Sequence, residues 1–145
     1  MASVVTNEFK LRSASAYLSG KDIRARLVMT LTTCDTENDG VAKLVDYTTI
    51  DPADSTGYAD VALANEAASK DDAGDRGEID ADDVVFSGLG GDASRDYQGV
   101  LLYEFVDGTN ANDIPAVFID FATDIPLTAT QVTVPWDAEG LIQYT

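Results

Sequence analysis

Histidine is absent from this chain of 145 residues, and Cys34 is its one cysteine. The missing imidazole excludes a Ser-His-Asp triad, a Cys-His pair and the usual catalytic zinc site, so we expect no enzymatic activity. A lone cysteine forms no internal disulfide, and Cys34 is predicted to be a small packing group at the end of a strand. No run approaches the ~20 apolar residues of a membrane span. The opening residues lack the regions of a secretory signal, so we expect synthesis in a cytoplasm.

Positive charge is scarce and unevenly placed. Nine Lys and Arg stand against 26 Asp and Glu, a formal net charge of −17. Five of the nine lie in residues 1–26, beside only two acids, and none follows Arg95. We expect no nucleic-acid partner, because each phosphate contact requires a cation. An acidic neighbour suits the basic N-terminal segment, although halophilic or marine adaptation also accounts for part of the acidity.

The N-terminal segment has the pattern of a short helix, with an extended arm as the alternative. Thr6 or Asn7 is a suitable N-cap, and Gly20 a suitable end. Two serines and a tyrosine lower its helix propensity. We therefore expect a helix or arm over residues 1–21, followed by one domain over residues 22–145.

The rest of the chain indicates strands. Residues 23–32 alternate with period two, which places Ile23, Ala25 and Leu27 on one face and Arg24 and Arg26 on the other, in solvent or against a partner. Many short strands with turn residues between them are typical of a sandwich or barrel. The predicted fold is all-β, a single jelly-roll-like β-sandwich. Further strands are expected at residues 58–64, 83–87, 99–107, 116–122 and 130–136.

Two acidic segments are candidate cation sites. Asp35, Asp39 and Gly40 resemble the start of an EF-hand loop, but Glu37 is too long for its position and a strand precedes the loop. Asp80 and Asp82 belong to a denser acidic cluster. A turn and a solvated face are the favoured interpretations. We expect no cofactor, with adventitious Ca²⁺ as the alternative.

Several short motifs resemble those of small virion proteins of tailed bacteriophages. They are a Gly-Tyr pair, an Asp-Arg pair, the run DADDVVF, an apolar strand, an Ile-Asp-Phe triplet and a tail that begins with tryptophan. The resemblance covers about residues 22–145, and the first 20 residues match less well. The motifs lie at residues 57–58, 75–76, 80–86, 100–105, 119–121 and 136–141.

The resemblance implies a head decoration, or cement, protein. Such proteins are β-rich, sit on the outer capsid surface and staple neighbouring major capsid subunits, often as symmetric oligomers. The expected partners are therefore the major capsid protein and further copies of this chain, with a trimer favoured. A tail or baseplate component, or a carbohydrate-binding sandwich that uses Tyr58, Tyr97 or Tyr103, is the alternative. The residues predicted to form the protein interface are Phe9, Arg12, Tyr17, Arg24 and Arg26.

Overall fold

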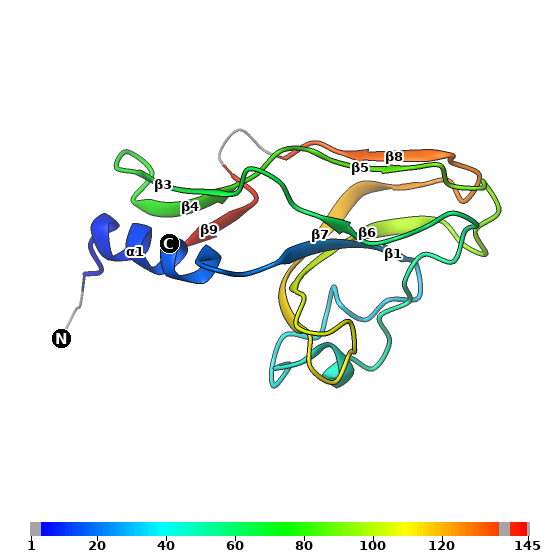
Figure 1. Ribbon diagram of the computed structural model, residues 1–145, viewed down its shortest axis with the longest axis horizontal. Helices are drawn as coiled ribbons and strands as arrows, with labels where there is room; N and C mark the ends of the chain where they lie inside the picture. Colours follow the sequence, from blue (N-terminus) through cyan, green and yellow to red (C-terminus); the bar gives the residue numbers. More distant parts are fainter. Residues whose placement is uncertain (1–3, 137–139, 145) are drawn as a thin grey trace. The chain divides into compact units, whose positions relative to one another are not determined.

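The computed structural model describes residues 4–136 and 140–144, and its fold is mainly β (Figure 1). Within this part of the chain one short α-helix accompanies three antiparallel sheets, of four, three and two strands. This confirms the sandwich-like β fold with a short N-terminal helix that the sequence predicts. The elements are α1 (Asn7–Leu18), β1 (Ile23–Met29), the 3₁₀ helix η1 (Leu44–Asp46), β2 (Val61–Ala62), β3 (Ala67–Asp71), β4 (Arg76–Asp80), β5 (Val84–Ser87), β6 (Tyr97–Glu104), β7 (Ile114–Ile125), β8 (Gln131–Val134) and β9 (Ile142–Tyr144).

The chain divides into two compact units. Unit 1 comprises Met1–Lys21, Leu63–Asp83 and Pro135–Thr145, and unit 2 comprises Asp22–Ala62 and Val84–Val134. The two later segments of unit 1 come from the range predicted to form the sandwich.

Unit 2 is built around β6. This strand pairs with β1 on one side and β7 on the other, in a sheet of order β2-β1-β6-β7. Residues 99–103 of β6 are all buried. Because side chains alternate along a strand, Val100 and Leu102 face one side of the sheet, and Leu101 and Tyr103 face the other. The strand is therefore covered on both faces, as its nearly continuous hydrophobic sequence predicts.

Segments of unit 2 itself cover the two faces of this sheet. On one face, Val28, Leu101 and Tyr103 pack against Cys34 and other residues of the segment between β1 and β2. Arg26 therefore faces the chain's own residues, with 13% of its side chain exposed, whereas Arg24 keeps 29% of its side chain exposed. Cys34 is buried, as predicted.

The small sheet β5-β8 lies over the opposite face within unit 2 (Figure 1). Its alternate side chains are buried, with Val84 opposite Val134 and Phe86 opposite Val132. The Phe86 ring stacks on Tyr58, with centroids 6.0 Å apart.

Strand β1 ends earlier than the alternation predicts. It stops at Met29, and Leu31 is 60% exposed rather than buried. The backbone NH of Met29 donates to the carbonyl of Asp51, and the NH of Leu31 donates to the Asp51 carboxylate. These bonds draw the chain into a turn, so the period-two pattern no longer describes which side chains are buried.

Unit 1 consists of α1 against the β3–β4 hairpin, with β9 on the other edge of β4. The helix buries Lys10 and Ala14, and the hairpin buries Ile79. Gly77 lies directly beneath the helix, where an added Cβ would stand 2.8 Å from the Lys10 carbonyl carbon. Glycine is therefore required for the close approach of helix and strand.

Helix α1 starts where the sequence predicts. The Thr6 hydroxyl accepts a hydrogen bond from the Phe9 NH, which identifies Thr6 as the N-cap. Ser19 is the C-cap, and Gly20 follows with φ +69°. This backbone conformation favours glycine after a helix.

Candidate interaction surfaces

Most of the basic residues of the N-terminal segment form ion pairs within the chain. In unit 1, Lys10 lies on the buried side of α1, and its Nζ is 3.2 Å from Asp75 Oδ1. The Lys10 ammonium also donates to the Asp75 backbone carbonyl. Arg12 is exposed on the same helix and pairs with Glu8 one turn earlier, with 3.0 Å between Nε and Oε1. Only Arg12 of these two presents its side chain to solvent.

Arg24 and Arg26 contact side chains of unit 2. Arg24 pairs with Asp22 at 2.7 Å, and its guanidinium lies 3.5 Å from the centre of the Phe105 ring. The hydrogen bond from Arg24 to Asp22 raises the pKa of the guanidinium. Arg26 pairs with Asp60 at 2.8 Å, and the side chain of Arg26 is 13% exposed.

Asp60 is the centre of a polar network. Its Oδ2 accepts from Arg26 and from the Tyr103 hydroxyl at 2.7 Å, while its Oδ1 accepts from the Tyr58 hydroxyl at 2.6 Å. Tyr58 in turn accepts from the Leu27 NH at 2.9 Å, which fixes the network to β1. Burial raises the pKa of Asp60, but the hydrogen bonds from Arg26, Tyr58 and Tyr103 outweigh it and hold that pKa below its usual value.

The tyrosines expected to stack on sugars face inwards. Tyr97 and Tyr103 are 0% and 1% exposed. The hydroxyl of Tyr58 lies between β1 and Asp60, and its ring stacks on Phe86. Burial and the neighbouring Asp60 raise the pKa of Tyr58 and Tyr103. The proposed aromatic platform is wrong for Tyr97 and Tyr103, because neither ring offers a free face.

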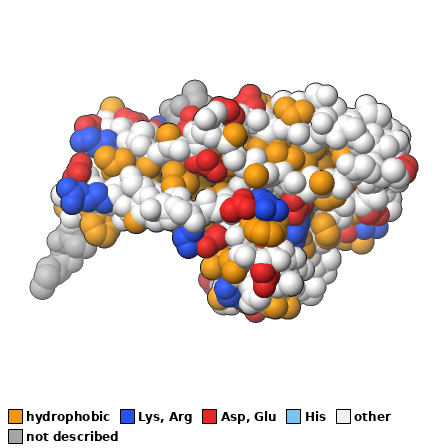
Figure 2. All heavy atoms as spheres, in the orientation of Figure 1, with side chains coloured by type: hydrophobic (Ala, Val, Ile, Leu, Met, Phe, Trp, Pro, Cys, Tyr) orange, Lys and Arg blue, Asp and Glu red, His pale blue; other side chains and the backbone are white. Residues whose placement is uncertain are grey.

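The space-filling view agrees with this pairing. On the face shown in Figure 2, Lys and Arg side chains lie next to Asp and Glu side chains and do not form a separate basic patch. The positive charge that is concentrated in the sequence is therefore dispersed by pairing. It does not form one electrostatic docking surface on that face.

Exposed apolar side chains instead mark the N-terminal end of unit 1. Val4, Val5 and Phe9 are 87%, 49% and 62% exposed, and together with Thr6 they line a hollow of about 320 Å³. We call Val4, Val5 and Phe9 the N-terminal apolar end. Tyr17 is half-buried on the same helix. Of the predicted interface residues, Phe9 and Arg12 are thus well exposed, whereas Arg26 is not.

The candidate cation ligands do not converge. Asp35 accepts from Gln98 at 3.2 Å, Asp80 caps the Ala81 NH, and Asp82 accepts from Asn65 at 2.6 Å. Asp39 is exposed. Within residues 4–136 and 140–144, no group of three or more acidic or cysteine side chains is placed to hold a metal ion.

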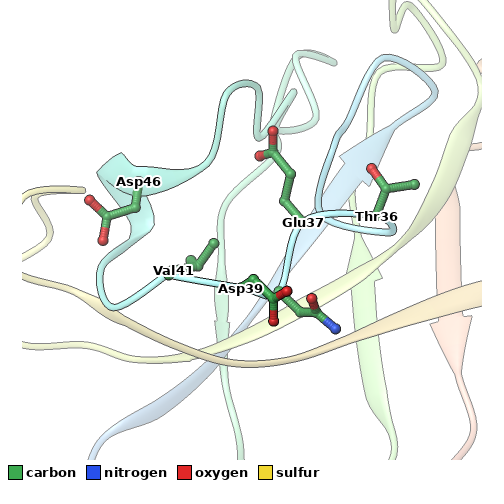
Figure 3. Close-up of a pocket in the computed structure, with 7 residues that line it drawn as sticks. Thr36, Glu37, Asp39, Val41 and Asp46 are labelled. Carbon is green, nitrogen blue, oxygen red and sulfur yellow. The ribbon is translucent and has the colours of Figure 1, made fainter.

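A pocket of about 320 Å³ lies along the acidic loop, and its lining includes Glu37, Asp39, Val41 and Asp46. In Figure 3 the carboxylates of Glu37, Asp39 and Asp46 point in different directions. Glu37 accepts from the side chains of Thr33 and Thr48, and Asp46 caps the backbone NH groups of Ala42 and Lys43. These acids organise the loop, so the resemblance to an EF-hand does not extend to its geometry.

A second pocket, of about 330 Å³, joins this loop to β7. Its lining was not singled out from the sequence, because residues 34–47 and 115–118 are distant in the chain. The alternation of residues 117–121 does indicate a strand, but it gives no sign of what lies beside that strand. The lining comprises Cys34, Asp35, Glu37, Asn38, Val41, Tyr47, Pro115, Ala116, Val117 and Phe118.

No helix in the described part of the chain is both long and apolar enough to cross a membrane. Comparison with protein-family models, curated proteins and solved structures gave no match.

Proposed function

We propose that this chain is a structural virion protein, a capsid decoration or cement protein of a tailed bacteriophage. It would bind the outer surface of the head and staple neighbouring major capsid subunits, acting as a homo-oligomer, with a trimer favoured. The role is mechanical and not enzymatic. Its site of action is the surface of the virion, after synthesis in the host cytoplasm.

The observation that carries the proposal is the N-terminal apolar end. Phe9 is 62% exposed near the start of α1. The helix is fixed to the hairpin by the ion pair of Lys10 with Asp75 and by its close approach to Gly77. A large aromatic side chain on a fixed helix suits an interface anchor, because little conformational entropy is lost when it is buried. Exposed apolar clusters on soluble proteins mark interaction sites. A stapling protein requires such an anchor.

The motifs of the phage resemblance lie at positions that build the fold. Tyr58 ties the network of Asp60 to β1, and Asp75, at φ +55°, ends the turn between β3 and β4. The other motifs fall mainly on β5, β6 and β7, and Trp136 donates to the Asp82 carbonyl at 2.7 Å. These contacts give physical roles to the residues on which the resemblance rests, and they support a β scaffold of that type.

A tail or baseplate component remains the second candidate, because the same scaffold would serve there. The carbohydrate-binding alternative loses two of its three aromatic candidates, since Tyr97 and Tyr103 are buried. The copy number of the protein in each particle distinguishes a head decoration protein from a tail component. In purified particles, a decoration protein is present in numbers comparable with the major capsid protein, and a tail component in only a few copies. Quantitative mass spectrometry of intact particles measures this ratio, and a tail-like ratio would overturn the proposal.

The anchor is tested with a matched pair of variants. Phe9 and Leu31 are 62% and 60% exposed, so Phe9→Ser and Leu31→Ser each remove a largely exposed apolar side chain. Leu31 is the control because it lies in unit 2, whereas the N-terminal apolar end belongs to unit 1. Truncating an aromatic anchor costs about 2 kcal/mol or more, roughly thirty-fold in affinity. We expect Phe9→Ser to lose binding to heads that lack the protein, in a co-sedimentation assay, and Leu31→Ser to retain it. Equal binding by both variants would contradict the anchor.

A further inference from the structure

Strand β7 is a long edge strand. It covers 12 residues, Ile114–Ile125, and ends the sheet order β2-β1-β6-β7. Among the described strands its pairing partner is β6, so its outer side presents backbone NH and carbonyl groups that no described strand takes up. Such an edge is a template for an added strand. β7 contains no lysine, and the features of it that limit pairing are Pro115, the acids Asp120 and Asp124 and the irregular register with β6.

The pocket of about 330 Å³ opens along this edge. It touches the four consecutive residues from Pro115 to Phe118. Pro115 and Phe118 pair with Tyr103 and Leu101, and a bulge at Ala116 separates them, so both share the sheet face that the loop after β1 covers. The pocket therefore lies where this face reaches the edge of the sheet at β7. The opposite wall is the loop that follows β1, with Asp35 and Glu37. A strand added to β7 would therefore run past the pocket mouth.

The chemistry of the pocket favours a cation. Its lining holds two carboxylates, Asp35 and Glu37, and includes no Lys or Arg. Hydrogen bonds from Thr48 and Thr33 lower the pKa of Glu37, which keeps it charged near neutral pH. Aromatic side chains, Tyr47 and Phe118, complete the walls. Rings and carboxylates together suit an ammonium or guanidinium group, because both attract positive charge.

A second copy of the chain is a poor source of that cation. Seven of its nine basic side chains form ion pairs within the chain, Lys43 donates to the Asn112 carbonyl, and Lys21 also has a partner. A basic segment of another protein is therefore the favoured source.

We propose that the outer edge of β7 accepts an extended segment of a partner protein as an additional strand, and that the pocket between Asp35 and Phe118 receives a Lys or Arg side chain of that segment. Backbone hydrogen bonds along the edge supply affinity, and the pocket supplies specificity. The identification of the partner as a capsid subunit rests on the proposed function. The recognition chemistry does not.

The recognition chemistry is tested on the purified protein with synthetic peptides. The probe is the N-acetylated, C-amidated peptide Thr-Val-Arg-Val-Thr, and its control carries Glu in place of Arg. We expect the Arg peptide to bind roughly ten-fold more tightly at low salt, since the swap replaces attraction to two carboxylates by repulsion. Binding should slow amide hydrogen exchange in residues 114–121 and shift NMR signals of residues 34–47.

Two neighbouring acids provide a matched pair of variants. Asp35 lines this pocket, whereas Asp39 lines the other pocket on the same loop, and both side chains are exposed. Asp35→Asn should weaken the Arg peptide about two- to five-fold and leave the Glu peptide no weaker. Asp39→Asn, with the same change in charge, should have little effect. Ala116 is exposed on β7 and lines the pocket. Ala116→Arg places a basic side chain there and should block binding of the Arg peptide.

Three outcomes overturn the inference. They are equal binding of the Arg and Glu peptides, exchange protection away from β7, and protection of β7 by rising protein concentration alone, which would make a second copy the occupant. The particle ratio tests the proposed function separately. A protein that binds the Arg peptide but is absent from heads retains this recognition chemistry and loses its assigned partner.

Discussion

Units 1 and 2 each enclose a basic side chain, and they do so in different ways. Lys10 of unit 1 is 7% exposed, but its partner Asp75 is 76% exposed and stays hydrated. Arg26 of unit 2 and its partner Asp60 are 13% and 17% exposed, and two tyrosine hydroxyls also bind the carboxylate. An ion pair with one exposed partner has a small desolvation cost and adds little to the free energy of unfolding. An enclosed pair is stable only while every member of its hydrogen-bond network is present. A basic side chain therefore forms a partly hydrated ion pair in unit 1 and an enclosed ion pair in unit 2.

The largest expected effect comes from Asp60→Asn. Removing one partner of an enclosed ion pair costs about 3–5 kcal/mol of unfolding free energy, because the remaining charge is left without compensation. Urea denaturation of the whole protein measures this cost, with hydrogen exchange of the β1 and β6 amides reporting on unit 2. The same change at Asp75 is the control, and should cost no more than about 1 kcal/mol, since Lys10 keeps its bond to the Asp75 carbonyl. Similar costs for the two variants would remove the contrast between the units.

The contact between helix and hairpin in unit 1 is tested by Gly77→Ala. The new Cβ would stand 2.8 to 2.9 Å from the backbone and Cβ of Lys10, so the helix must shift. Overpacking of this kind costs about 1–3 kcal/mol. Amide exchange should become faster in α1, β3 and β4, while β6 stays protected. Unchanged exchange in α1 would show that the helix is not held at this point.

The N-cap of α1 gives a smaller effect. Thr6→Ala removes the acceptor for the Phe9 NH and should destabilise the helix by about 1 kcal/mol. Ser13→Ala is the comparison within the same helix, because the Ser13 hydroxyl bonds back to the Phe9 carbonyl. That change should be neutral or stabilising by a few tenths of a kcal/mol. Far-ultraviolet circular dichroism during thermal unfolding distinguishes the two variants.

The smallest expected difference concerns acid. The pKa of Asp60 is lower in the folded protein than the usual ~3.9 of an unfolded aspartate, so its charge stabilises the fold above that pH. This contribution is lost as the pH falls from about 4 through the folded pKa. The Asp60→Asn variant lacks this contribution, so its free energy of unfolding should fall less steeply below about pH 4 than that of the unmodified protein. Parallel slopes for the two proteins would mean that Asp60 keeps an ordinary pKa when folded.

The strands of unit 2 were predictable because hydrophobic side chains mark them directly. Strand β6 is buried on both faces, as expected, and β5, β7 and β8 lie within or close to their predicted ranges. The β3–β4 hairpin was missed, since its sequence AASKDDAGDRGEID shows no alternation of apolar residues. Its strands are stabilised instead by α1, which packs on it from residues far away in the chain.

Phe9 and Arg12 were predicted from the sequence as interface residues, and the structure shows both side chains exposed. The pocket beside β7 was not, because its two walls come from segments about 80 residues apart. Glu37 illustrates the difficulty. In sequence it is an ill-fitting EF-hand position, while in the fold it is a charged wall of a pocket that only β7 completes.

Composition and periodicity alone determined that this chain is mainly β, because burial of apolar side chains along a strand has a local period that the sequence displays. The choice between a helix and an extended arm for the N-terminal segment needed the structure. Tertiary structure alone decided the fate of its charges. Arg26 and Asp60 are 34 residues apart, and nothing near either of them signals the pairing. Coulomb attraction depends on distance in space and on burial, neither of which is written along the chain.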